Sequence, residues 1–297
     1  MTERFNFIYR LKLFVLARIA DMRLLSLLDD LYHVLCLPFG YLAYRAHRLL
    51  GRPYFGIWLG SSQGNPFRHK YLSKSIDVLI AGLHADGHPP ESAKVRVLEI
   101  GAYAGASAIV WGLAVKGHKV KHAEVYSVDP WDSYLDLERN RRIRYRMMDV
   151  ALANGRIFEL FRENIEAAGL STVCIPIKGT SAEAMASFDK ESLDLIYIDG
   201  DHHVDAVKAD LQRAVPLLKE GGLLCGDDLE IQLADIDAGF ARRNVDSDMA
   251  VDPATGVAYH PGVTIAVADF FGRRIACYEG YWVVRKTGTG FEDVALV

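Results

Sequence analysis

The sequence contains few cysteines, and none of them form a closely spaced pair. The four cysteines in 297 residues, Cys36, Cys174, Cys225 and Cys277, lie far apart along the chain. Without a CxxC pair the chain lacks the usual ligand spacing of a structural zinc site. It also has too few cysteines for a disulfide-stabilised scaffold. We therefore expect a reducing, cytoplasmic setting.

A long apolar run and a secretion signal are also missing. The most apolar stretch, LYHVLCLPFGYLAY at residues 31–44, contains His33 and Pro38 and is too short to cross a bilayer. The N-terminus has no compact apolar core followed by a small-residue cleavage site. We expect neither a transmembrane helix nor a signal peptide.

Excess positive charge is missing as well. The chain has 34 Lys and Arg against 38 Asp and Glu, a net charge of -4, so we expect no nucleic-acid partner. The charge is uneven, because the first 52 residues hold eight basic and four acidic side chains, which leaves 26 and 34 in the remainder. With 51% hydrophobic residues, the acidic remainder can bury a large core.

The basic N-terminal part has apolar residues at helical spacing. They are Phe7, Leu11, Phe14 and Ile19, followed by Leu24, Leu28, Leu31 and Leu35. This spacing predicts amphipathic helices with Arg and Lys on the other face. A Gly-, Pro- and Ser-rich stretch follows, so we divide the chain into a helical extension at 1–58 and a main domain at 59–297. Membrane-surface contact through residues 1–50 is one role for the extension; we favour an intramolecular role or a homo-oligomer interface.

Short runs of branched aliphatic residues alternate with helical patterns from Val95 onward. We predict strands at 95–100, 124–128, 172–177, 193–198 and 222–226, and an antiparallel hairpin that turns at Glu279 and Gly280. Strands alternating with helices are typical of βαβ units and a parallel sheet. The predicted fold is therefore α/β, a doubly wound, mainly parallel Rossmann-like sheet with a C-terminal antiparallel hairpin and an N-terminal helical extension.

The segment VLEIGAYAGASA predicts a strand, a glycine-rich turn and a helix. Such a turn lets a ligand approach the backbone at Gly101 and Gly105 and points helix amides at an anionic group, although it can also be a simple tight connection. The GAYAG spacing places Tyr103 where a dinucleotide fold would have a second glycine, which disfavours NAD. Asp129 ends the next strand, where an acid can accept hydrogen bonds from ribose hydroxyls.

The string EIGAYAGAS closely resembles the first motif of catechol O-methyltransferase and its relatives. The resemblance implies S-adenosylmethionine as cofactor. The adenine position of the family maps to Ser181 in KGTSAEAM, where a helix cap is an equally good interpretation. The cofactor-binding residues that the resemblance implies are Glu99, Gly101, Ala102, Tyr103, Gly105, Ser107, Asp129, Ser181 and Asp199.

Three acids follow two further strands of the predicted sheet. Asp199 ends one strand, and Asp227 and Asp228 end the next. Because these strands are neighbours in the predicted order, the carboxylates should converge, and their repulsion would raise their pKa values unless a cation neutralises them. Oxygen-only ligands favour Mg²⁺, Mn²⁺ or Ca²⁺ over zinc. A turn or helix-capping role is the alternative, and it is the one we favour for Asp201.

The string YIDGDHHVDAVKADLQRAVPLLKEGGLLCGDD resembles the family of macrocin O-methyltransferase, and cephalosporin hydroxylase-like proteins share the pattern. The resemblance implies that Asp199, Asp227 and Asp228 bind the metal, which we expect to be Mg²⁺. It also implies a general base three residues after the first ligand, at His202. His203 is the alternative, but neighbouring helical side chains point about 100° apart, so only one imidazole can face the metal.

These observations predict a metal-dependent O-methyltransferase that moves a methyl group from S-adenosylmethionine to a hydroxylated small molecule, such as a sugar or natural product. One alternative is a hydroxylase-like relative without methyl transfer, although the sequence shows no clear iron-binding triad. Another is a membrane- or partner-docking protein that uses the N-terminal helices. The polar segment 229–260 is expected to cover the acceptor pocket, with Phe240, Arg242, Arg243 and His260 as contacts.

Overall fold

The computed structural model describes residues 22–60, 65–85, 87, 93–134, 137 and 142–296. The first predicted helical pattern, Phe7 to Ile19, lies outside these residues. The helices are α2 (Met22–Leu49), α3 (His69–Ala85), α4 (Ala106–Gly117), α5 (Ile143–Ala153), α6 (Arg156–Ala167), α7 (Ser181–Met185), α8 (Val204–Leu217), α9 (Ala238–Arg243) and α10 (Pro261–Phe271). Within the described part of the chain, no helix has both the length and the apolar character needed to span a membrane.

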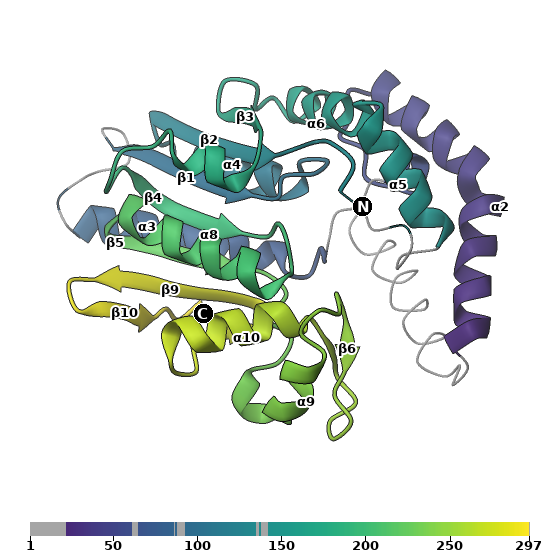
Figure 1. Ribbon diagram of the computed structural model, residues 1–297. Helices are drawn as coiled ribbons and strands as arrows, with labels where there is room; N and C mark the ends of the chain where they lie inside the picture. Colours follow the sequence, from purple (N-terminus) through teal and green to yellow (C-terminus); the bar gives the residue numbers. More distant parts are fainter. Residues whose placement is uncertain are drawn as a thin grey trace.

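A single mixed sheet forms the centre of the protein (Figure 1). Its strands are β1 (Lys94–Ile100), β2 (His122–Asp129), β3 (Cys174–Lys178), β4 (Leu193–Ile198), β5 (Leu218–Gly226), β8 (Cys277–Tyr278), β9 (Tyr281–Thr287) and β10 (Gly290–Asp293). The main order is β10-β9-β5-β4-β1-β2-β3, and β8 pairs with β9. The five strands from β1 to β5 are parallel, whereas β9 runs antiparallel to β5. The predicted doubly wound, mainly parallel Rossmann-like sheet with a C-terminal antiparallel hairpin is confirmed.

Alternation along the strands divides the core into two layers. In β1, Val95 and Val97 face one apolar cluster, which includes residues of α3, α4 and α6. Leu98 and Ile100 face the other cluster, which includes residues of α7, α8 and α10. Figure 1 shows α8 and α10 in front of the sheet and α3 behind it. Because both faces are covered, the central strand β4 is buried along its whole length.

The predicted C-terminal hairpin is present. Strands β8 and β9 pair across a turn at Glu279 and Gly280, with Cys277 opposite Trp282. Strand β10, which was not predicted from the sequence, pairs with β9 and forms the edge of the sheet. The hairpin places Trp282 against the end of β5, where it is 1% exposed.

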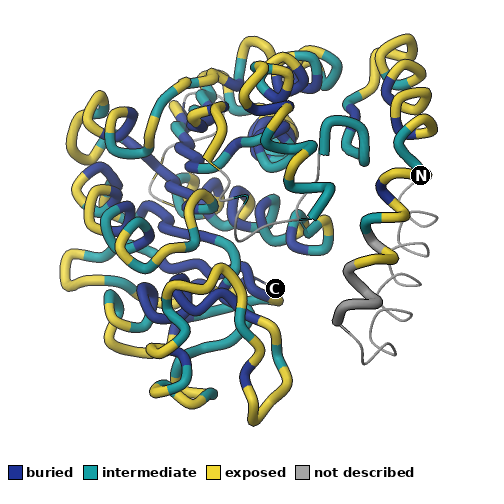
Figure 2. The backbone as a smooth tube through the Cα atoms, turned by 45° about the vertical axis from the view of Figure 1, so that its right-hand side comes forward, coloured by how far each residue is buried: buried dark blue, intermediate teal, exposed yellow. Residues whose placement is uncertain are grey.

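The N-terminal helix α2 packs along the side of the molecule. Tyr44 donates a hydrogen bond to Glu163 of α6 at 3.0 Å, and Arg48 forms an ion pair with the same carboxylate at 2.8 Å. The outer side of α2 is exposed along much of its described length (Figure 2). The predicted boundary after residue 58 falls within the short helix η1 (Trp58–Gly60).

The polar segment 229–260 is folded rather than irregular. It contains η2 (Leu233–Asp235), α9 and the two-stranded β6 (Ala250–Val251) and β7 (Ala258–Tyr259). Ala241, Tyr259 and Ile265 form a small buried cluster of their own beneath it. A segment with its own apolar cluster can hold side chains over the neighbouring strand ends in fixed positions.

The carboxyl ends of the parallel strands meet at one edge of the sheet. Strand β1 lies between β2 and β4, so the chain leaves the sheet in opposite directions on either side of it. Ligands of doubly wound folds bind at this kind of switch point. A Cβ at Gly101, which follows β1 with a φ of 94°, would overlap the carbonyl oxygen of Asp199 after β4. Only glycine therefore allows these two strand ends to approach so closely.

We expect Gly101→Ala to lower the free energy of unfolding by roughly 2–4 kcal/mol, because the new methyl group must displace backbone and the residue keeps a positive φ. Urea unfolding followed by circular dichroism measures the change. Gly117→Ala in α4 is the matched control, since a Cβ there meets nothing within 4 Å. Equal stability of Gly101→Ala and the wild type would show that this close contact is not required.

Candidate active site at the carboxyl edge of the sheet

The glycine-rich turn after β1 is fixed against β2. The amides of Gly101 and Ala102 both donate to the carbonyl of Val128, at 2.9 and 3.2 Å. Gly101, Tyr103 and Gly105 have positive φ values of 94°, 40° and 87°, so the turn is tightly wound. These amides are occupied within the protein, and a ligand would have to use other donors.

Such donors lie at the start of α4. Gly105 is the N-cap of this helix and has no side chain to cap it, so the first-turn amides of Ala106 and Ser107 have no partner within the helix. Asp129 lies beside the turn, where it accepts from the amides of Tyr103 at 2.9 Å and Trp131 at 2.7 Å. An uncapped helix start next to a carboxylate suits a ligand with both an anionic group and hydroxyl donors.

Two predicted cofactor residues, Glu99 and Ser181, have different surroundings. Glu99 is completely buried, and burial raises the pKa of its carboxyl to about 8, with Ser127 and Ser107 partly opposing the shift. Ser181 donates to Asp210 at 2.6 Å. The helix cap at this loop is Thr180, which accepts from the amide of Glu183. The structure thus places Glu99 below the turn and Ser181 in a local hydrogen bond.

The predicted acids lie together at the ends of β4 and β5. The amide of Asp199 donates to Ile100 on β1 at 2.9 Å, and the amide of Asp227 donates to Ile198 on β4 at 3.2 Å. These bonds continue the sheet and bring the three acids to one narrow cleft of about 10 Å³, roughly the space of one water molecule. The cleft is lined by Ile198, Asp199, Gly200, Asp201, His202, Val207, Asp227, Asp228, Val263 and Trp282.

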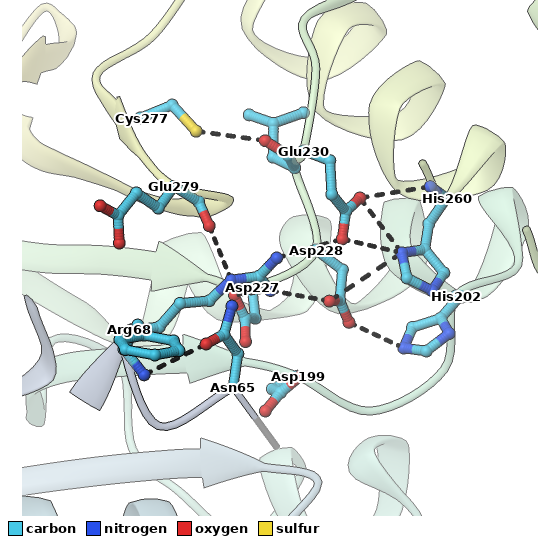
Figure 3. A network of polar contacts seen from close by, with 12 residues as sticks. Asn65, Arg68, Asp199, His202, Asp227, Asp228, Glu230, His260, Cys277 and Glu279 are labelled. Carbon is cyan, nitrogen blue, oxygen red and sulfur yellow. Dashed lines mark hydrogen bonds and ion pairs between the residues drawn. The ribbon is translucent and has the colours of Figure 1, made fainter. Parts of the chain in front are cut away.

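Arg68 neutralises part of this acidic cluster. This arginine was not predicted from the sequence. Its guanidinium donates to Asp227 at 2.5 Å, to Asp228 at 2.8 Å and to Glu230 at 3.2 Å (Figure 3). It also donates to the carbonyl of Glu279 at 2.7 Å. Only 9% of the Arg68 side chain is exposed. A buried arginine with four acceptors is fixed in place and supplies the nearest permanent positive charge.

The pKa values of the acids follow from this arrangement. Burial and the charges of Asp227 and Asp228 raise the pKa of Asp199 well above its usual value. Burial and the charge of Asp228 also raise the pKa of Asp227, although Arg68 opposes the shift. The pKa of Asp228 is lowered in spite of its burial, because it accepts from His202 and lies near Arg68 and His260.

His202 lies between two carboxylates. Its Nε2 is 3.0 Å from Asp228 Oδ2, and its Nδ1 is 2.8 Å from Asp248 Oδ1. A carboxylate only accepts hydrogen bonds, so both ring nitrogens carry a proton in this arrangement. Burial opposes the charge, but the two bonds raise the pKa of His202 to about 11. His203 points elsewhere and lies 2.5 Å from Asp201.

His260 is the second histidine of the site. Its ring centroid lies 4.3 Å from that of His202, and its Nδ1 is 3.2 Å from the carboxylate of Glu230. A Cβ at Gly262 would overlap the carbonyl oxygen of His202. Glycine at this position therefore allows α10 to bring His260 next to His202.

Among the described residues, two groups of donor atoms lie within 4.8 Å of one another: His202 with Asp248 and His260, and Asp228 with Glu230 and His260. Asp199 and Asp227, predicted as metal ligands, belong to neither group. Glu230 and Asp248 were not singled out from the sequence. Glu230 lies two residues after Asp228, and this closeness to the acidic pair is the sequence feature that could have identified it.

The predicted acceptor contacts do not all face the site. His260 faces the site, whereas Arg242 donates to Asp269 on α10 at 2.9 Å. Arg243 lies 3.9 Å from Asp237, which caps its own helix α9. Arg242 is thus paired with α10, and Arg243 is paired within the polar segment 229–260, called the covering segment below. The covering segment reaches His202 through Asp248.

Replacing Arg68 by Met should lower the free energy of unfolding by about 3–5 kcal/mol, because buried carboxylates lose their counter-charge. Urea unfolding at neutral pH measures this loss. Lys70→Met provides the control: Lys70 pairs with Glu279 at 3.4 Å, and both side chains are about half exposed, so its effect on stability should be much smaller than that of Arg68→Met. Similar losses for the two variants would show that the Arg68 contacts contribute little.

Comparison with known proteins addresses the identity of the domain. Residues 98–229 match the profile of a family described as a methyltransferase domain. No curated protein matches the chain.

Several solved structures are similar over most of the chain. The O-methyltransferase NovP has 14% identity and a TM-score of 0.48, over 73% of this chain and 80% of that one. An O-methyltransferase from Bacillus cereus in complex with SAH has 18% identity and a TM-score of 0.44, with 75% and 82% covered. TomG from Streptomyces achromogenes, in complex with SAM, has 14% identity and a TM-score of 0.41, with 72% and 90% covered.

The matched segment begins inside β1 and ends after Asp228, so it contains the glycine-rich turn, Asp129 and the acids that follow β4 and β5. The narrower resemblance to the macrocin and catechol enzymes stays a prediction. The prediction of a methyltransferase is confirmed for this segment: residues 98–229 match a family described as a methyltransferase domain.

Proposed function

We propose that the protein is an S-adenosylmethionine-dependent O-methyltransferase whose acceptor is a hydroxyl of a small molecule. The observation that carries the proposal is the extent of the family match, residues 98–229, which includes both the turn after β1 and the acidic edge of β4 and β5. The cofactor and the reacting hydroxyl would therefore bind within one matched domain. A sugar or natural product as acceptor remains the expectation from the sequence resemblance.

The turn region suits S-adenosylmethionine by its chemistry. Asp129 is 5% exposed and has lone pairs left for ribose hydroxyls beside the two amides it accepts from. The uncapped start of α4 offers amides to the carboxylate of the methionine part. Tyr103, which donates to the carbonyl of Gly60 at 3.2 Å, connects this turn to η1.

His202 is the proposed base for the acceptor hydroxyl, and its contacts set a condition on that role. A base must be neutral, whereas His202 is held between Asp228 and Asp248 with both nitrogens protonated. Release of Asp248, which is half exposed on the covering segment, would free Nδ1. An acceptor hydroxyl in that position would then face a neutral imidazole that keeps its bond to Asp228.

A divalent ion remains part of the proposal, and the predicted ligands fit it in part. Asp199, Asp227 and Asp228 line a cleft with room for one small ion, and their oxygens suit Mg²⁺ or Mn²⁺. Arg68, however, already binds one oxygen of Asp227 and one of Asp228. When bound, such an ion lowers the pKa of a coordinated hydroxyl. Arg68 contributes permanent positive charge to the same edge of the sheet.

The N-terminal helix supports an accessory role. Its inner side is fixed to α6 through Tyr44 and Arg48, which agrees with the favoured intramolecular role. Its outer side carries exposed Leu31, Leu35 and Phe39. These side chains suit the homo-oligomer or membrane-surface contact that the sequence suggested.

Cofactor binding is the first test. S-Adenosylmethionine should bind the wild type in calorimetry, and Asp129→Ala should weaken binding by about 10- to 100-fold, because charge-assisted hydrogen bonds to the ribose are lost. Asp132→Ala is the control, since Asp132 is exposed and accepts a hydrogen bond from the amide of its neighbour Ser133. Thermal unfolding checks that both variants are folded. A wild-type protein that binds neither S-adenosylmethionine nor S-adenosylhomocysteine would contradict the proposal.

The role of His202 is tested by turnover. Release of S-adenosylhomocysteine is measured with a panel of sugars and phenols as acceptors. His202→Gln should lower kcat by roughly 100- to 10,000-fold while cofactor binding is kept, as expected for loss of a general base. His203→Gln, the neighbouring exposed histidine, should keep wild-type kcat. Unchanged turnover in His202→Gln would remove His202 from the role of base.

A further inference from the structure

Two histidines and a carboxylate meet beside the acidic cleft. His202 comes from the loop after β4, Asp248 from the covering segment before β6, and His260 from the N-cap of α10. One donor atom from each lies within 4.8 Å of the others. Gly262 allows α10 to pass close to His202, and this close approach brings His260 to the group.

The distances suit a common ion. His202 Nδ1 and Asp248 Oδ1 are 2.8 Å apart. Two ligand atoms at neighbouring positions around one metal, each about 2.1 Å from it, lie about 3.0 Å apart in an octahedral site and about 3.4 Å apart in a tetrahedral one. The His202 and Asp248 donors therefore need little movement to bind one ion, and the His260 ring lies 4.3 Å from the His202 ring, centroid to centroid.

Both imidazoles are held by carboxylates on their other side. His202 Nε2 is bonded to Asp228 at 3.0 Å, and His260 Nδ1 is bonded to Glu230 at 3.2 Å (Figure 3). A histidine that binds a metal nearly always donates its second N–H to a carboxylate, a carbonyl or water, which fixes the ring and its tautomer. Two such carboxylates, each 18% exposed, serve the two histidines here.

We propose that His202, Asp248 and His260 form a binding site for a first-row transition-metal ion such as Mn²⁺, Fe²⁺, Co²⁺ or Zn²⁺. His202 binds through Nδ1, His260 through Nε2 and Asp248 through one carboxylate oxygen. Two imidazoles and one carboxylate favour these ions over Mg²⁺, which prefers oxygen ligands. Asp228 and Glu230 act as positioning residues that orient the two rings.

This site is distinct from the predicted one on Asp199, Asp227 and Asp228, and it stands whether or not the protein binds S-adenosylmethionine. While an ion is bound, His202 is a metal ligand and not a base, because a metal-bound Nδ1 cannot accept a proton. The ion adds positive charge to an edge where Arg68 is the permanent cation among Asp227, Asp228 and Glu230. Without an ion, the same contacts form a network of hydrogen bonds between histidine and carboxylate.

The test uses the full-length chain, freed of metal with a chelator and titrated with Co²⁺ alone, without cofactor. Visible absorption of bound Co²⁺ reports nitrogen ligation, and calorimetry gives the affinity. Asp248→Ala and His260→Ala should each weaken Co²⁺ binding at least 100-fold, and Glu230→Gln should weaken it about 10- to 100-fold as an orienting partner. Asp248 is half exposed, so its replacement leaves the core intact.

His203→Ala is the matched control, since His203 is adjacent to His202 but turned toward Asp201, and it should bind Co²⁺ as the wild type does. Competition with a hundredfold excess of Mg²⁺ should displace little Co²⁺. Three outcomes would overturn the proposal: no Co²⁺ binding by the wild type, binding that survives in Asp248→Ala and His260→Ala, and binding abolished by Asp199→Asn alone. Because S-adenosylmethionine is absent, failure here leaves the methyltransferase proposal to its own calorimetric test.

Discussion

The ion pairs between Arg68 and the acids that follow β5 are the interaction on which this end of the protein depends. Parallel strands that end side by side bring their terminal side chains together, and here those side chains are carboxylates in a largely buried setting. Their repulsion and desolvation oppose folding unless positive charge is near. Arg68, fixed by Asp227, Asp228, Glu230 and the carbonyl of Glu279, supplies that charge from the segment just before α3.

The same interaction links parts of the chain that the sequence keeps apart. Arg68 joins the start of the main domain to the end of β5 and to the C-terminal hairpin. On the other side of the edge, Tyr103 connects the glycine-rich turn to Gly60. The cofactor half of the site is thus held by a contact to Gly60, and the acidic half by contacts to Arg68.

His202 is the residue at which the two proposed chemistries meet. Facing Asp228 and Asp248, it holds two protons. With Asp248 displaced it can act as a base, and with Asp248 bound to a shared ion it can act as a metal ligand. The position of Asp248 decides between the base and the metal-ligand role. Asp228 is largely buried after β5, whereas Asp248 lies on the covering segment. The folded character of residues 229–260 matters for this reason: it places both Asp248 and His260 beside His202.

The sequence by itself determined the order of strands and helices, the glycine-rich turn and the acids at the strand ends, because these features are local patterns of hydrophobicity and turn chemistry. It also determined the hairpin at Glu279 and Gly280. Only the tertiary structure decided what surrounds the acids. Arg68, Asp248 and His260 lie far from Asp228 in sequence and follow no periodic pattern, so their meeting depends on how α3, the covering segment and α10 pack on the sheet. Packing and charge neutralisation act between segments that are distant in sequence, so the local spacing of residues does not predict them.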